Sequence, residues 1–209
     1  MFDMAFQSVW YSTGLPEKLV KTIDEELFSE FKDSMEVSSL YKGEVNKETR
    51  NSSNAWIPSG HWLPGFLWHY VSLANRSNFL YDIDCIDMNS IQYTQYTEGQ
   101  FYKWHTDHGL LNMYKPETED TTGEQYISDK INTEYENVRK LSIVMQLSDP
   151  SDYEGGNLQL LDENGKAYFA PRTRGTVIIF DSRTQHRVLK VTSGVRRSIV
   201  GWVVGPRWK

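Results

Sequence analysis

The sequence predicts an α+β protein, mainly β, in which a double-stranded β-helix (jelly-roll) core carries N-terminal helices packed on its major sheet. Two observations predict this class. Before residue 85, apolar residues recur at helical spacing. From there to the C-terminus, short β-branched and aromatic runs alternate with Gly, Asp and Asn turns, and no helical pattern separates them. Strands joined only by turns pair antiparallel, which favours a sandwich or barrel over a parallel sheet.

We expect one domain over residues 1–209, with a mainly helical support layer over 1–84 and the jelly-roll core over 85–209. A chain of 209 residues is long enough to bury one sizeable core. The sequence shows neither an internal repeat nor a Pro/Gly-rich linker that would divide it.

Two helices are predicted in the support layer. The segment 15–32 places apolar side chains at positions 19, 20, 23, 27, 28 and 31, which is a helical spacing. Gly14 precedes this segment and Pro16 suits its first turn. The segment 63–74, LPGFLWHYVSLA, forms the second predicted helix, again with a proline near its start.

The core strands are predicted in chain order from their alternating apolar and polar residues. They lie in the runs CIDMNSIQYTQY, QFYKWHTD, RKLSIVMQLS, NLQLLD, KAYFAP, GTVIIFD, HRVLKV and RRSIVGWVVG. The turn ENG between NLQLLD and KAYFAP indicates a hairpin. The segment 110–137 is polar and acidic and carries no predicted element. A loop of that length inside a compact domain is usually functional.

The composition of the chain bears on its binding partners and on its cellular location. The net charge of −6 argues against nucleic-acid binding, which needs clustered Lys and Arg. No apolar run is long enough to span a membrane, and the N-terminus lacks the features of a signal peptide. Cys85 is the single cysteine, so no intrachain disulfide can form, and we expect it to be a small buried side chain. A cytoplasmic location follows as the expectation.

The segment QFYKWHTDHG suggests a metal site. His105 and Asp107 are two residues apart, so on a strand they point to the same face and can bind one metal. A third ligand must come from elsewhere. The other histidines are His61, His69, His108 and His186. The first two lie in the predicted helical layer and the third faces away, whereas His186 opens a strand across the core and is the best choice.

Two histidines and one carboxylate match the facial ligand set of non-haem Fe(II) oxygenases, although the same set can hold Zn²⁺ with a catalytic water. A nearby anion site favours iron. Arg196 and Ser198 are again two residues apart on a predicted strand, so guanidinium and hydroxyl point the same way. An arginine fork backed by a hydroxyl suits the distal carboxylate of a keto diacid. Arg197 would face the other side of the sheet.

The ordered set YTEGQFYKWHTD, YEGGNLQLL and GTVIIFDSRTQHRVLKVTSGVRRSIVGW resembles the Fe(II)/2-oxoglutarate-dependent dioxygenases, and within them the prolyl 4-hydroxylase-like branch. The resemblance covers roughly residues 91–204. It implies that His105, Asp107 and His186 are the catalytic metal ligands. Many collagen-type relatives have Lys where this chain has Arg196, so the closest subfamily remains open. The expected chemistry is the same, because either cation would bind the carboxylate of 2-oxoglutarate.

The resemblance also assigns the surrounding residues. It implies that Arg196, Ser198 and Tyr96 bind the distal end of 2-oxoglutarate and that Tyr102 lines the substrate entrance. Related halogenases lack the carboxylate that Asp107 supplies, so its presence favours hydroxylation.

The implied reactants are Fe(II), 2-oxoglutarate and O₂, with ascorbate as a candidate reductant. The implied reaction hydroxylates an unactivated C–H bond, with a prolyl residue of a peptide or protein as the first choice of substrate. A free amino acid or another small molecule is the alternative. A zinc hydrolase and a catalytically silent jelly-roll binding module are the alternatives from other classes. The sequence predicts neither the oligomeric state nor a membrane or nucleic-acid partner.

Overall fold

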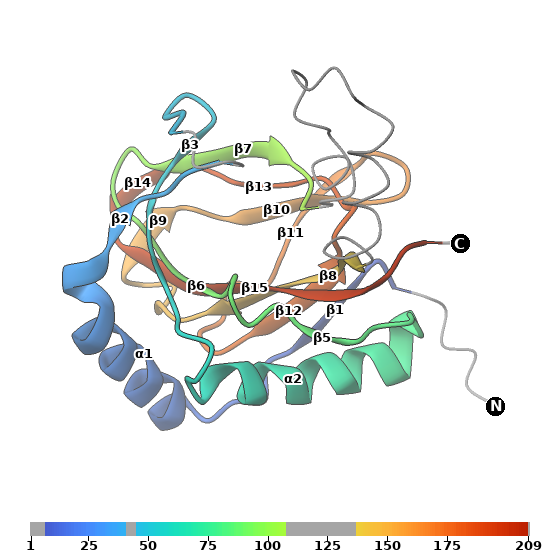
Figure 1. Cartoon of the computed structure of the whole chain (residues 1–209). Helices are drawn as coiled ribbons and strands as arrows, with labels where there is room; N and C mark the ends of the chain where they lie inside the picture. The colour runs from blue at the N-terminus through green and yellow to red at the C-terminus, as the bar shows by residue number, and fades with distance from the viewer. Residues whose placement is uncertain (1–6, 41–44, 108–136, 209) are drawn as a thin grey trace, which may run out of the picture.

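The computed structural model describes residues 7–40, 45–107 and 137–208, and it is built in three layers (Figure 1). Two helices lie under a large antiparallel sheet, and a smaller antiparallel sheet lies on the other side of that sheet. The predicted fold class is confirmed, because helices pack on the major sheet of a two-sheet core. The predicted loop 110–137 lies outside the described residues except for its last position.

The helices agree with the sequence prediction to within two residues. They are α1 (Glu17–Phe31) and α2 (Leu63–Ala74), followed by a 3₁₀ turn η1 (Lys32–Ser34) and a π-helical turn η3 (Asn75–Phe79) respectively. Pro16 stands just before α1, and a proline occupies the first turn of α2, where its missing N–H is not needed.

Among the described residues, the major sheet has eight strands. In sheet order they are β1 (Val9–Ser12), β12 (Val177–Asp181), β8 (Asn137–Gln146), β15 (Arg196–Pro206), β6 (Gln92–Tyr96), β4 (Ser53–Trp56) and β2 (Glu36–Val37), with β5 (Cys85–Ile86) paired to β15. The minor sheet runs β11 (Ala167–Phe169), β10 (Leu158–Leu161), β13 (His186–Val188), β7 (Phe101–His105) and β3 (Arg50–Asn51). A separate pair is formed by β9 (Tyr153–Gly155) and β14 (Val191–Gly194).

The central strands of the major sheet are buried on both faces. In β8, Leu141, Ile143 and Met145 pack into the hydrophobic cluster under the helices. The alternate residues, among them Ser142 and Val144, face the minor sheet and are also buried. A strand in the middle of a layered fold has no solvent face, so the space between the two sheets is where a buried site can form.

Helix α1 is fastened to the sheet by a buried ion pair. Arg197 points away from the minor sheet, as predicted, and donates from Nε and one terminal nitrogen to the two carboxylate oxygens of Asp24 at 2.9 and 2.7 Å. Arg174 reaches the same carboxylate at 3.5 Å. Asp24 is 2% exposed, so its two arginine partners supply the compensation that a buried carboxylate requires.

Two expectations need correction. The first 84 residues contain β1 to β4 as well as helices, and these strands extend both sheets. Each has only two to four residues, too few for an alternating pattern to be read. Cys85 is exposed rather than buried, because β5 lies at the margin of the sheet, where β15 is its one partner among the described strands. Among the described residues, no helix has both the length and the hydropathy needed to span a bilayer.

The contact between α2 and the sheet provides a test of the fold. Leu67 is fully buried in this contact, whereas Leu73 on the same helix is 44% exposed. Leu67→Ala is expected to lower the free energy of unfolding by about 2–5 kcal/mol, because it removes apolar burial and leaves a cavity. Leu73→Ala should change it by less than about 1 kcal/mol. Urea denaturation of both variants measures the difference, and equal losses would contradict this packing.

Candidate metal centre

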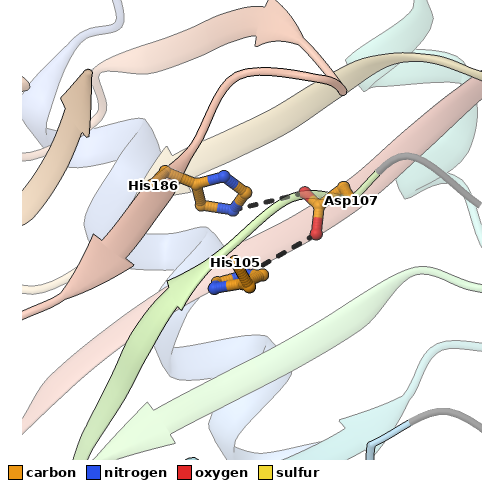
Figure 2. Close-up of side chains that lie close together, drawn as sticks. All are labelled: His105, Asp107 and His186. Carbon is orange, nitrogen blue, oxygen red and sulfur yellow. Dashed lines mark ion pairs between the residues drawn. The ribbon is translucent and has the colours of Figure 1, made fainter. Parts of the chain in front are cut away.

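Three side chains meet in the space between the sheets, two from the strands β7 and β13 and one from the segment that follows β7 (Figure 2). His105 ends β7, Asp107 follows two residues later, and His186 begins β13, which pairs with β7 so that the two histidines are opposite each other. Asp107 is held by its backbone N–H, which donates to the Ser182 carbonyl at 2.9 Å. The sequence analysis expected His105 and Asp107 on one face of a strand, whereas Asp107 lies just beyond the end of β7, and the three side chains still lie close together.

The donor atoms of the three residues face a common point. Oδ1 of Asp107 is 3.6 Å from Nε2 of His105, and Oδ2 is 3.4 Å from Nε2 of His186 (Figure 2). One ligand atom from each residue lies within 4.8 Å of the others. Their side chains are at most 15% exposed, so the cluster is largely shielded from water.

Both histidines are fixed in the tautomer that a metal ligand needs. Nδ1 of His105 lies 2.8 Å from the carbonyl oxygen of Lys103, and Nδ1 of His186 lies 3.0 Å from that of Thr184. A carbonyl oxygen can only accept a hydrogen bond, so each Nδ1 carries the hydrogen. The Nε2 lone pairs are then free to bind a cation.

The electrostatics of the cluster favour a neutral His105 imidazole beside an ionised Asp107 carboxylate. Burial and the neighbouring His186 lower the pKa of His105 to about 3. Burial alone would raise the pKa of Asp107, but His186, His105 and Arg139 outweigh it and lower that pKa to about 2. Two imidazole nitrogens and one carboxylate oxygen are the donor set that suits Fe(II), so the residues present fit that metal.

Ser142 is a partner of the cluster that the sequence analysis missed. Its hydroxyl donates to Oδ2 of Asp107 at 2.8 Å and lies 3.1 Å from the hydroxyl of Ser182. This contact orients the carboxylate, as outer partners of metal ligands commonly do. The available signal was a serine inside the otherwise apolar run LSIVM of β8.

A β-bulge brings Tyr102 onto the same face as His105. His186 pairs with His105 and Val188 with Tyr102, so two steps along β13 match three along β7. The extra residue rotates the strand, and the Tyr102 ring stacks on the His105 ring at 3.5 Å between centroids, with 16° between their planes. Burial, the largest influence, raises the pKa of Tyr102 to about 12, so its hydroxyl remains protonated.

The cluster opens into a cavity of about 50 Å³ between the sheets. Its polar lining includes Arg50, Tyr96, Arg196 and Ser198 in addition to the three clustered residues. The sequence analysis named every one of these except Arg50. Val144, Leu158 and Val200 supply apolar walls.

Arg196 lies in this cavity without a carboxylate partner among the described residues. It is 1% exposed, and its terminal nitrogens donate to Ser198 Oγ at 3.3 Å and Gln146 Oε1 at 2.9 Å. Its buried Nε has no hydrogen-bond partner in the described chain, and the Tyr96 ring lies 5.6 Å from the guanidinium. A buried cation with only neutral partners and an unused donor is suited to bind an anion.

Gly156 allows this arginine to pack closely. Its φ of +61° is rare for other residues, and a Cβ there would lie 3.2 Å from the Arg196 side chain and 2.9 Å from that of Val191. Position 156 therefore requires glycine for two reasons, its positive φ and the close packing of Arg196 and Val191.

The sequence comparison decides the family. Residues 91–204, more than half of the chain, match the family described as the 2OG-Fe(II) oxygenase superfamily. The chain belongs to this superfamily. The oxygenase is thus a 2-oxoglutarate-dependent dioxygenase, and the family uses Fe(II), 2-oxoglutarate and O₂. The sequence resemblance and the predicted enzyme class are confirmed.

Relatives of the oxygenase include several PKHD-type hydroxylases. It is 26% identical to one from Parvibaculum lavamentivorans over 82% of this chain and 67% of the relative. It is 28% identical to another from a Picosynechococcus species over 90% of this chain and 71% of the relative.

Solved structures share the fold of the oxygenase. A Pseudomonas putida prolyl-4-hydroxylase matches with a TM-score of 0.68 at 20% identity, over 98% of this chain and 96% of that chain. A Trichoplax adhaerens prolyl hydroxylase in complex with a hypoxia inducible factor peptide fragment matches with a TM-score of 0.66 at 15% identity, over 94% and 83% of the two chains.

Proposed function

We propose that this oxygenase is a single-domain hydroxylase of prolyl residues in a peptide or protein, with His105, Asp107 and His186 as its metal ligands. The observation that carries the reaction is the His–Asp–His cluster in one cavity with a buried arginine that has no acidic partner in the described chain. A zinc hydrolase would leave Arg196 and Ser198 without a role. A silent binding module would be expected to have lost one of these groups.

The residues around the proposed metal site have separate roles. When bound, Fe(II) supplies the activation of O₂ and the oxidation of the C–H bond, coupled to decarboxylation of 2-oxoglutarate. Asp107 and the two histidines would hold the metal from one side and leave the other side for ligands. Ser142 keeps the carboxylate oriented by its 2.8 Å hydrogen bond.

The far end of 2-oxoglutarate would bind at Arg196. The guanidinium offers its unpaired Nε–H and further terminal N–H groups, and Ser198 presents a hydroxyl beside it. Tyr96 lies against the same guanidinium and would complete the pocket. Tyr102, stacked on His105, would form the wall on the substrate side and exclude water from the metal.

The choice of a prolyl substrate rests on the relatives. Both solved neighbours described above are named prolyl hydroxylases, and one holds a peptide fragment. We further propose that ascorbate maintains the reduced metal and that the enzyme works in the cytoplasm, in keeping with its single cysteine.

A peptide screen tests the substrate. The enzyme, with Fe(II), 2-oxoglutarate and ascorbate in air, is expected to add one oxygen atom to proline in some members of a library of amidated proline-containing peptides. Matched peptides with alanine in place of that proline should remain unmodified. Mass spectrometry locates the oxygen, and an enzymatic assay counts succinate. Oxygen gain on free L-proline but on no peptide would contradict the peptidyl substrate, whereas absence of succinate would contradict the reaction itself.

A further inference from the structure

A second buried arginine lines the same cavity. Arg50, on β3 at the edge of the minor sheet, is 8% exposed and is one of the residues around the space that holds the metal cluster. It donates from Nε to Ser52 Oγ at 3.0 Å and from a terminal nitrogen to Gln92 Oε1 at 3.0 Å. A third, longer contact of 3.4 Å reaches the Ser39 carbonyl.

All three partners of Arg50 are neutral, and none of the acids in the described part of the chain forms an ion pair with it. A guanidinium has five N–H groups, so two remain available after these contacts. Burial of a cation without a counter-ion is costly, which a bound anion would offset.

The anion that Arg50 can bind is not the 2-oxoglutarate carboxylate assigned to Arg196. On β6, Tyr96 pairs with Arg196 across the sheet, while Gln92, the partner of Arg50, pairs with Val200. These positions are four residues apart, roughly 13 Å along the strand. The two arginines are therefore held at different positions along β6, Arg50 through Gln92 and Arg196 beside Tyr96.

Arg50 instead lies beside the reacting centre. Its guanidinium carbon is 5.0 Å from the centre of the Tyr102 ring, and that ring stacks directly on His105. A group held by Arg50 would therefore lie in the same cavity as the metal cluster, beside the ring that stacks on His105. The charge balance points the same way, because Arg50 and Arg196 face the cavity while Asp107 is the one carboxylate among its described lining residues.

From this geometry we propose that the substrate carries a carboxylate on the target residue or on its neighbour in the chain, and that Arg50 binds it. The proposal rests on the proposed function and narrows its substrate class. The carboxylate has two sources, an acidic residue adjacent to the target in a peptide or the α-carboxylate of a free amino acid or C-terminal residue. Both present the same planar anion to the arginine fork.

Matched probes test the proposal by affinity rather than by turnover. The peptides N-acetyl-Gly-Pro-Asp-amide and N-acetyl-Gly-Pro-Asn-amide differ in one charge, as do L-proline and L-prolinamide. Each is titrated by calorimetry, without O₂, into the enzyme loaded with Mn(II) and 2-oxoglutarate. In at least one pair the carboxylate probe is expected to bind about tenfold or more tightly than its amide, the range of a charged hydrogen bond. The pair that shows the difference identifies the source.

Two variants assign the preference to Arg50. Arg50→Gln removes the charge, and Gln92→Glu leaves Arg50 in place but gives it a carboxylate of its own. Both are expected to reduce the ratio between charged and neutral probes to about one. Gln159→Glu is the matched control, because Gln159 accepts from Arg187 Nε at 2.7 Å in the same way but is not among the residues that line the cavity. It should leave the ratio unchanged.

The outcomes separate this proposal from the general function. Equal or absent binding of both members of every pair to the wild-type enzyme overturns the carboxylate site, and so does a ratio that persists in Gln92→Glu. Conversion of 2-oxoglutarate to succinate by the wild-type enzyme is measured in parallel, and its absence would count against the oxygenase reaction instead.

Discussion

Replacement of His186 by alanine is expected to weaken Fe(II) binding by more than about 100-fold and to reduce succinate formation to background. Loss of an outer partner of a metal ligand typically costs 10–100-fold, and loss of a ligand itself should exceed that range. His186 is 5% exposed and lies opposite His105. Because the site is buried, a water molecule or a surface side chain would be a poor substitute for the lost imidazole ligand. Metal content after anaerobic dialysis and the rate of succinate formation measure the effect.

The matched control is His69→Ala, which removes an exposed histidine on α2, far from the cluster in sequence and in a different layer. It should retain full metal content and activity. Retention of stoichiometric iron by the His186 variant, or the same loss in both variants, would show that the cluster is not the metal site.

The second large effect is expected at Arg196. Arg196→Gln should raise the KM for 2-oxoglutarate by about 10–100-fold, because a charge-assisted hydrogen bond contributes roughly 1.5–3 kcal/mol. Arg196→Lys keeps the charge but loses the planar fork, so its KM should lie between those of the wild type and Arg196→Gln. Initial rates of succinate formation at varied 2-oxoglutarate give the KM directly.

Arg76→Gln serves as the control for a lost surface charge, because Arg76 is exposed in the turn η3 that follows α2. Its KM should match that of the wild type. The account of the co-substrate pocket would be wrong if Arg196→Gln kept the wild-type KM, or if only kcat fell while iron remained bound.

Much of the site could be predicted because its key residues follow the period of a strand. His105 with Asp107, and Arg196 with Ser198, are spaced by two, and both pairs face the space between the sheets. The third ligand followed from the order of the strands, since His186 opens the strand that pairs with β7. Long, strongly patterned segments such as 63–74 were predicted with the same boundaries that the structure shows.

The remaining features depend on tertiary contacts that leave no local pattern. The bulge in β7 that stacks Tyr102 on His105 arises from pairing with β13 and has no signature in the FYKWH run. Arg50 belongs to a two-residue strand in a segment predicted to be helical support. Its place in the cavity is decided by Gln92 and Tyr102, which come later in the chain.

The central claim is that three side chains hold one ferrous ion in a cavity where Arg196 binds 2-oxoglutarate. The most direct test is an anaerobic titration of the protein with Fe(II) and then 2-oxoglutarate, followed by visible absorption. The account predicts a metal-to-ligand charge-transfer band that saturates at one iron per chain, requires both additions, and is lost in His186→Ala. Iron binding without this band, or a band that survives the loss of His186, would contradict it.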